Sequence, residues 1–371
     1  MAASSDFAAT IRSIVGEYCP SVENQVIQAS YLLQYIEIKT RSANKGSKAR
    51  GSFANLYALY VLVEDYVNVS KDDHFKYSDY KGAKFSELFA RQRQLPFGEK
   101  LQNHALNHRL NEEFKKYFPT VKQMPIVRDP ETNRYWINEN LLRVTTEGKN
   151  VVLARPILAI IEAYIEAKSQ AFNSFIATCE QLKTVAEQKH DQAIDFILSL
   201  LAPNIDARIF EIVSFSILKY YYHDQVVYFG LTRDTVTEER LKLYKTGRTN
   251  ANDGGIDFVM KPLGRFFQVT ETTDVRKYFL DIEKLERYPI TFVVKSDHSD
   301  KSILDAMKRK ALETYGVNQV VDKYMSAIEE VINIPTLSKH FVHAIDLGYL
   351  PQMLEEIVLQ SRIEFNLSDD S

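Results

Sequence analysis

The stretches GGIDFV at residues 254–259 and FFQVTE at residues 266–271 decide the fold of this chain. We expect them to form a β-hairpin, in which the glycines before Asp257 permit tight turning of the backbone. Gln268 and Thr270 alternate along the second strand and therefore share one face, which a normal register makes the face of Asp257. Glu271 is expected on the opposite face unless a bulge turns it.

Helical and strand patterns surround this hairpin. Apolar periodicity predicts a helix over residues 206–222 and a strand over 226–231. A helix over 274–287 is expected to cross over to the apolar strand 290–294, and helices fill most of 300–362. This order predicts an α/β core, a small mixed sheet flanked by helices.

The first part of the chain has a different pattern. We place a domain boundary near residue 148, at a Gly-Lys-Asn break, which gives domains 1–148 and 149–371. Residues 1–148 are expected to be mostly helical, with a hairpin near 126–137. The order helix, turn, helix, hairpin over 84–140 is that of a winged helix, although many α+β domains share it. The whole chain is therefore predicted to be of the α+β or α/β class.

Composition excludes several classes of protein. The chain has 371 residues and a net charge of −3, so it is not a general basic coat for nucleic acid. It has no long apolar run and no leader-like N-terminus, which predicts a protein without a membrane span. Cys19 and Cys179 are too few for a disulfide framework, so we expect reduced thiols and a cytoplasmic location in a prokaryotic cell.

The carboxylates of the hairpin suggest a metal site. Hydrolysis of a phosphodiester uses a divalent metal that stabilises charge on the oxygens and makes hydroxide available near neutral pH. Mg²⁺ prefers oxygen ligands and takes few from protein, usually one or two carboxylates. Asp257 stands where a strand begins and Glu271 stands near the end of the next one, so both are candidate ligands for Mg²⁺.

This region resembles the PD-(D/E)XK superfamily, which holds most type II restriction endonucleases and the modification-dependent Mrr-like nucleases. Its members have an Asp at one strand end and Glu-x-Lys or Gln-x-Lys on the neighbouring strand. Asp257 matches the Asp, residues 268–270 match the second element, and Glu211 matches a Glu that the preceding helix often has. The resemblance covers about residues 205–296 and implies a restriction-endonuclease-like core that cuts DNA with magnesium.

The family lysine falls on Thr270, which is a departure from the pattern. Thr270 can still hold a water molecule, and a lysine can arrive from elsewhere in the fold. The candidate lysines are Lys245, Lys261 and Lys295. The resemblance implies catalytic roles for Asp257, Gln268, Thr270, Glu211 and Glu271.

Two basic regions of domain 1–148 are candidates for DNA binding, since affinity for DNA comes largely from phosphate contacts. A loop over residues 39–51 has five basic residues and none that are acidic. A helix over residues 99–117 presents a polar stripe suited to reading base edges in the major groove. The candidate residues are Lys39, Arg41, Lys45, Lys48 and Arg50 in the loop, and His104, His108, Arg109, Asn111 and Lys115 on the helix.

We therefore expect a sequence-specific endonuclease for double-stranded DNA, a type II enzyme of a restriction-modification system. A homodimer is implied, because two cuts on opposite strands of a palindrome need two active sites. Three alternatives stay open at this point. They are a modification-dependent nuclease with the same core, a DNA-binding protein without catalysis, and a helical interaction protein without a nucleic-acid role.

Overall fold

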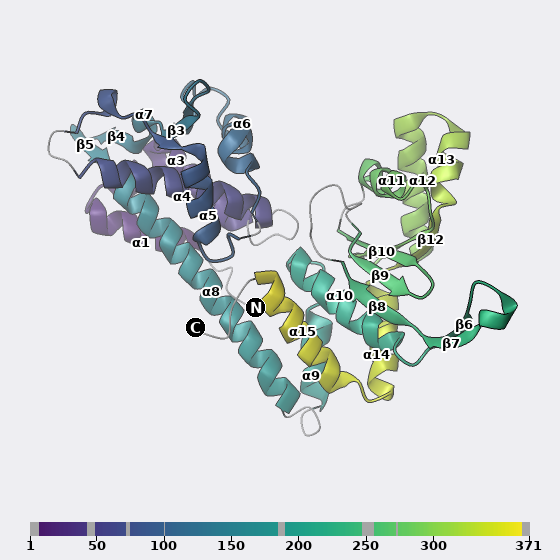
Figure 1. The fold of residues 1–371 in the computed structure, drawn as a ribbon. Coiled ribbons are helices and arrows are strands. Elements are labelled where there is room, and N and C mark those ends of the chain that lie inside the picture. Colours follow the sequence, from purple (N-terminus) through teal and green to yellow (C-terminus); the bar gives the residue numbers. More distant parts are fainter. Residues whose placement is uncertain are drawn as a thin grey trace. The chain divides into compact units, whose positions relative to one another are not determined.

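The computed structural model describes residues 7–42, 49–71, 75–99, 101–184, 190–246, 256–271 and 274–365. The chain has a mixed α+β fold and divides into two compact units, Met1–Phe175 and Ile176–Ser371 (Figure 1). This division lies inside a long helix, α8 (Ala154–Thr184), rather than at the expected break near residue 148. Within the described residues, we find no helix that is both long and apolar enough to cross a membrane.

Unit 1 is built from helices and two small sheets. Its three-stranded sheet has the order β1-β3-β2, and β4 pairs with β5 in a separate hairpin. The elements of unit 1 are α1 (Phe7–Tyr18), α2 (Glu23–Ala29), α3 (Tyr31–Ser42), α4 (Ala49–Val69), η2 (Tyr77–Asp79), β1 (Ala83–Lys84), α5 (Phe85–Gln94), η3 (Ala105–Arg109), α6 (Leu110–Tyr117), β2 (Ile126–Asp129), β3 (Arg134–Ile137), α7 (Glu139–Leu142), β4 (Arg143–Thr146), β5 (Lys149–Val152) and the first part of α8.

The expected winged-helix order is present over α5, η3, α6, β2 and β3, but it differs in one detail. The turn η3 is a π-helix, which places an extra residue in that turn and shifts the side chains that follow it. Helix α2 ends before Ser30, whose Oγ accepts a hydrogen bond from Leu33 N–H at 3.2 Å at the start of α3. Serine favours such caps over helix interiors.

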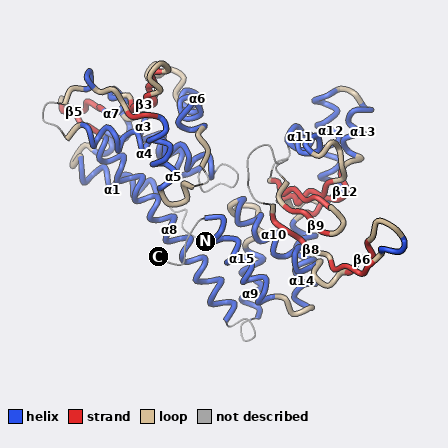
Figure 2. The backbone as a smooth tube through the Cα atoms, in the orientation of Figure 1, coloured by secondary structure: helices blue, strands red, loops and turns tan. Residues whose placement is uncertain are grey.

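Unit 2 contains a mixed five-stranded sheet with the order β12-β11-β10-β9-β8 (Figure 2). Strands β8, β9 and β10 are antiparallel, whereas β10, β11 and β12 are parallel. The elements of unit 2 are the end of α8, α9 (His190–Ser199), α10 (Ala207–Tyr221), β6 (Val226–Phe229), η4 (Arg233–Thr235), β7 (Thr237–Arg240), β8 (Lys242–Lys245), β9 (Phe258–Lys261), β10 (Arg265–Thr270), α11 (Val275–Lys284), β11 (Ile290–Val294), α12 (Asp300–Tyr315), α13 (Asn318–Met325), β12 (Ile328–Ile332), α14 (Ile334–Asp346) and α15 (Leu350–Phe365).

The sheet of unit 2 has helices on both faces. On one face, Phe258 packs against Phe215 of α10, with ring centroids 5.2 Å apart. On the other face, Phe292 of β11 packs edge-on against Tyr278 of α11 at 4.7 Å and joins an apolar cluster with α12 and α13. Side chains alternate between faces along a strand, so this packing assigns the residues of β8, β9, β10 and β11 to the α10 face or the α11 face. The predicted mixed sheet flanked by helices is therefore present.

Candidate active site

Asp257 lies immediately before β9 and is bound to the neighbouring strand. Its N–H donates to the carbonyl oxygen of Phe267 at 3.1 Å, and its Oδ2 accepts a hydrogen bond from Val269 N–H at 2.7 Å. These two bonds lie on either side of Gln268, and the paired register of β9 with β10 ends one residue earlier, at Phe258 opposite Phe267. The carboxylate is thus held at one end of the pair. The two glycines before it in the sequence, residues 254 and 255, lie outside the described residues.

Gln268 and Thr270 share a face, as the alternation predicted, and that face is covered by α11. Gln268 is 7% exposed, and its Oε1 has no hydrogen-bond partner among the described residues. Thr270 is buried and forms a hydrogen bond with Tyr278 of α11. A buried polar atom without a partner is uncommon and asks for an explanation, such as an ordered water or an ion.

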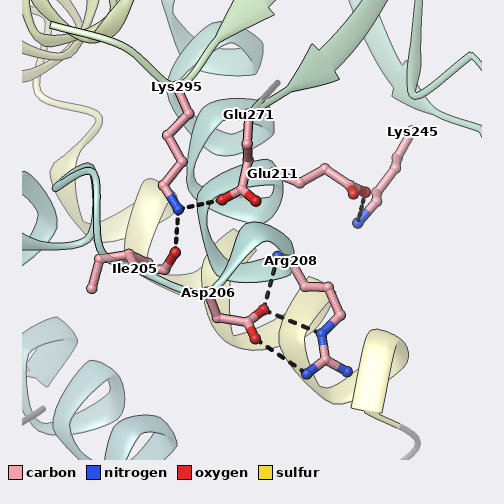
Figure 3. A network of polar contacts seen from close by, with 7 residues as sticks. All are labelled: Ile205, Asp206, Arg208, Glu211, Lys245, Glu271 and Lys295. Carbon is pink, nitrogen blue, oxygen red and sulfur yellow. Dashed lines mark hydrogen bonds and ion pairs between the residues drawn. The ribbon is translucent and has the colours of Figure 1, made fainter. Parts of the chain in front are cut away.

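Glu271 lies on the opposite face, next to a buried lysine. Lys295 Nζ donates to Glu271 Oε1 and to the carbonyl oxygen of Ile205, the second residue before α10 (Figure 3). The side chain of Lys295 is only 2% exposed, and its ammonium lies 5.7 Å from the ring centroid of Phe210. Parallel pairing of β10 with β11 sets Thr270 beside Val294, and the next residues of the two strands are Glu271 and Lys295.

Glu211 forms a second buried ion pair on the same face of the sheet. Its Oε1 lies 3.1 Å from Nζ of Lys245, the last residue of β8 (Figure 3). Burial raises the pKa of the Glu211 carboxyl, while Lys245 lowers this pKa and Glu364 raises it further. Asp206 caps the start of α10 by accepting a hydrogen bond from Arg208 N–H at 2.9 Å. This cap fixes the turn from which Glu211 projects.

We expect Glu211 to make stability depend on pH. A carboxyl whose pKa is raised on folding gives stability that is fully present below its ordinary value of 4.5 and is lost as pH rises through the folded pKa. From about pH 5 to about pH 8, the contribution of Glu211 to the free energy of unfolding should therefore decrease, and Glu211→Gln should remove this contribution. Denaturant unfolding of the wild type and of Glu211→Gln at both pH values measures this difference in the free energy of unfolding. Exposed Glu238→Gln is the control, and an equal fall in wild type and Glu211→Gln would contradict the assignment.

The predicted residues thus form two groups instead of one. Glu211 and Glu271 lie on the α10 face with Lys245 and Lys295, whereas Gln268 and Thr270 lie on the α11 face. Among the described residues, no three His, Cys, Asp or Glu side chains gather closely enough to hold a metal ion. Of the three candidate lysines, Lys245 and Lys295 each contact a predicted carboxylate.

The predicted DNA-binding residues of unit 1 have different environments. Lys39 is 4% exposed and ion-paired with Glu113, which also pairs with Arg109 at 3.1 Å. Asn111 bonds the backbone of Ile126 through both its amide nitrogen and its oxygen, at 2.8 and 2.9 Å. These contacts hold unit 1 together and use the groups that a phosphate or a base edge would need.

Other predicted residues of unit 1 remain on the surface. His104, His108 and Lys115 are exposed, and the two histidine rings lie 5.8 Å apart. Arg41 is exposed and pairs with Glu37 on its own helix. Lys45 and Lys48 lie outside the described residues, and Arg50 is placed only as part of the backbone of α4. The π-turn η3 explains why Asn111 leaves the polar stripe that regular helical spacing predicts.

Comparison with known proteins identified no relative of this chain. No protein-family model matches it, and neither a curated protein nor a solved structure matches it.

Proposed function

We propose that unit 2 is a metal-dependent endonuclease of the PD-(D/E)XK type that cuts double-stranded DNA. The observation that supports this most is the Glu271–Lys295 pair at the ends of β10 and β11. Glu271 lies two residues beyond Val269, whose N–H holds the carboxylate of Asp257. Two carboxylates and a lysine are therefore concentrated at one end of the hairpin, which is the set of groups that the family pattern combines.

The order of the elements also supports this proposal. A helix bearing Glu211 precedes three antiparallel strands, and Asp257 stands just before the second of them. A crossover helix, α11, then leads to a strand that runs parallel to β10. The sequence predicted the helix, the hairpin, the crossover helix and the apolar strand of this order, and in our proposal Lys295, just after β11, takes the place of the missing strand lysine.

The side chains at this end of the sheet fit a magnesium ion. Asp257 and Glu271 offer carboxylate oxygens at this end of β10, whereas the buried carboxamide of Gln268 lies on the opposite face of the sheet from Glu271. Oxygen donors of this kind suit Mg²⁺, which needs only one or two carboxylates. When bound, the ion would neutralise charge on the phosphate and make hydroxide available.

The residues themselves have separable tasks in this proposal. Asp257 is oriented by the Val269 N–H and would hold the metal. Lys295 is held by Glu271 and by the Ile205 carbonyl, so its ammonium is pre-oriented. A fixed positive charge placed where a phosphate gains negative charge stabilises the transition state. Unit 1 would bind DNA through its exposed His104, His108 and Lys115.

Digestion of unmethylated phage DNA tests this function. The full chain with magnesium is expected to give discrete fragments, because a type II enzyme acts at defined sites, and a homodimer would cut both strands. Binding without cleavage in magnesium or manganese would contradict the proposal and favour a non-catalytic DNA-binding protein. Cleavage only after methylation of the DNA would also contradict it, in favour of a modification-dependent nuclease.

A further inference from the structure

The hairpin of β6 and β7 projects from unit 2 and is almost entirely exposed (Figure 1). Its large apolar side chains are in water, including Tyr228 at 74% and Leu231 at 94% exposure. An isolated two-stranded hairpin is marginally stable in water. The described residues supply no third strand to either of its edges.

The loop of this hairpin is nevertheless well formed. The Thr235 Oγ1 accepts a hydrogen bond from Thr232 N–H at 3.0 Å, and Thr235 N–H donates back to the Thr232 carbonyl at 3.1 Å. Gly230 packs so tightly that a Cβ there would lie 2.5 Å from the Thr235 carbonyl oxygen. An ordered hairpin with an exposed apolar surface is more typical of a recognition element than of a flexible connection.

The two strands of the hairpin differ in character. Strand β6 (VVYF) has no charged residue, whereas β7 (TEER) has three. Charged side chains are the usual means of protecting an exposed strand edge from pairing, so β7 is protected and β6 is not. The uncharged edge is therefore the one suited to pairing with another strand.

We propose that β6 is the contact strand between two copies of this chain. The register follows from the hydrogen bonds. Leu241 N–H donates to the Gln225 carbonyl, so Gln225–Leu241 is a hydrogen-bonded pair, and such pairs alternate along an antiparallel ladder. The N–H and C=O groups of Val226 and Tyr228 consequently point away from β7, toward the open edge.

In one register, the outward N–H and C=O groups of Val226 and Tyr228 all pair with the same groups of the second copy. It is antiparallel, pairs Val226 of each copy with Tyr228 of the other, and sets the two Val227 side chains against each other at a two-fold axis. Every side chain in that contact is apolar or aromatic. The same register on β7 would place a charged side chain at every position of the contact, with Glu239 against its own copy and Glu238 against Arg240. Self-association through β6 is therefore favoured over β7.

Two matched double variants of the full chain test the contact. Val226→Lys with Tyr228→Lys places like charges together at both hydrogen-bonded pairs of the dimer. Val226→Glu with Tyr228→Lys places opposite charges there, and the two variants differ only in the sign of the charge at position 226. Both variants place two charged side chains on the exposed strand β6, so they match each other in polarity. Sedimentation velocity over a range of concentrations measures dimerisation, and circular dichroism checks that both variants fold.

The wild type is expected to form a concentration-dependent dimer. The Lys/Lys variant should raise the dimer dissociation constant at least about tenfold, whereas the Glu/Lys variant should stay within about threefold and become sensitive to salt. A wild type that is monomeric at every concentration, or a Lys/Lys variant that dimerises like wild type, would overturn the proposal. The test measures association alone, so its outcome is independent of whether the chain cuts DNA.

Discussion

Replacing Lys295 with methionine is expected to lower the rate of DNA cleavage about 100- to 1000-fold, the loss seen when one transition-state-stabilising donor is removed. Methionine matches the lysine in length but has no charge to place beside the phosphate. The variant should also unfold more easily, by about 3 kcal/mol, because Glu271 would keep its negative charge without the ammonium that neutralises it. A cleavage assay and denaturant unfolding measure the two effects separately.

A double variant distinguishes catalysis from stability at this pair. Lys295→Met with Glu271→Gln removes both charges, so it should recover much of the lost stability, since replacing a whole buried pair is often neutral. Cleavage should stay low in the double variant, because neither the lysine nor the carboxylate is restored. Recovery of cleavage together with stability would show that the pair only supports the fold.

Asp257→Asn is expected to reduce magnesium-dependent cleavage about 1000-fold while leaving the fold intact. The asparagine oxygen can still accept the hydrogen bond from Val269 N–H, so the strand end should keep its geometry. What is lost is the negative charge that the metal needs. Cleavage rates, with DNA affinity measured at the same salt concentration, test this. Affinity should change by less than about threefold, because phosphate contacts elsewhere dominate binding.

Asp234→Asn is the matched control for this variant. It makes the same chemical change at an exposed position in the η4 turn. That control should cut DNA at the wild-type rate. Unchanged cleavage by Asp257→Asn would show that the metal site has been placed on the wrong residue.

The central part of unit 2 could be predicted from sequence because its pattern is strongly periodic. The helix α10, the β9–β10 hairpin, α11 and the apolar strand β11 all lie within a few residues of their expected positions. Strands β7, β8 and β12 were missed. Their sequences, TEER, KLYK and IEEVI, mix charged residues into short strands, and such strands form because a partner strand pairs with them.

The candidate site was predictable only in part, because strand pairing also decides which of its side chains meet. Alternation correctly placed Gln268 and Thr270 on one face and Glu271 on the other. The sequence named Lys295 as one of three candidate lysines, but the parallel register of β10 and β11 brings it to Glu271, and pairing between distant strands has no local signal. In unit 1, one residue of the expected polar stripe has moved for a local reason, since the π-turn η3 directs Asn111 toward Ile126.

Incubation of the full chain with supercoiled plasmid DNA of known sequence, once with magnesium and once with a chelator, tests the central claim most directly. A metal-dependent endonuclease should convert the plasmid to linear fragments with defined ends in magnesium and leave it supercoiled in the chelator. Plasmid that stays intact in magnesium, or that is cut equally well in the chelator, would contradict the proposed function.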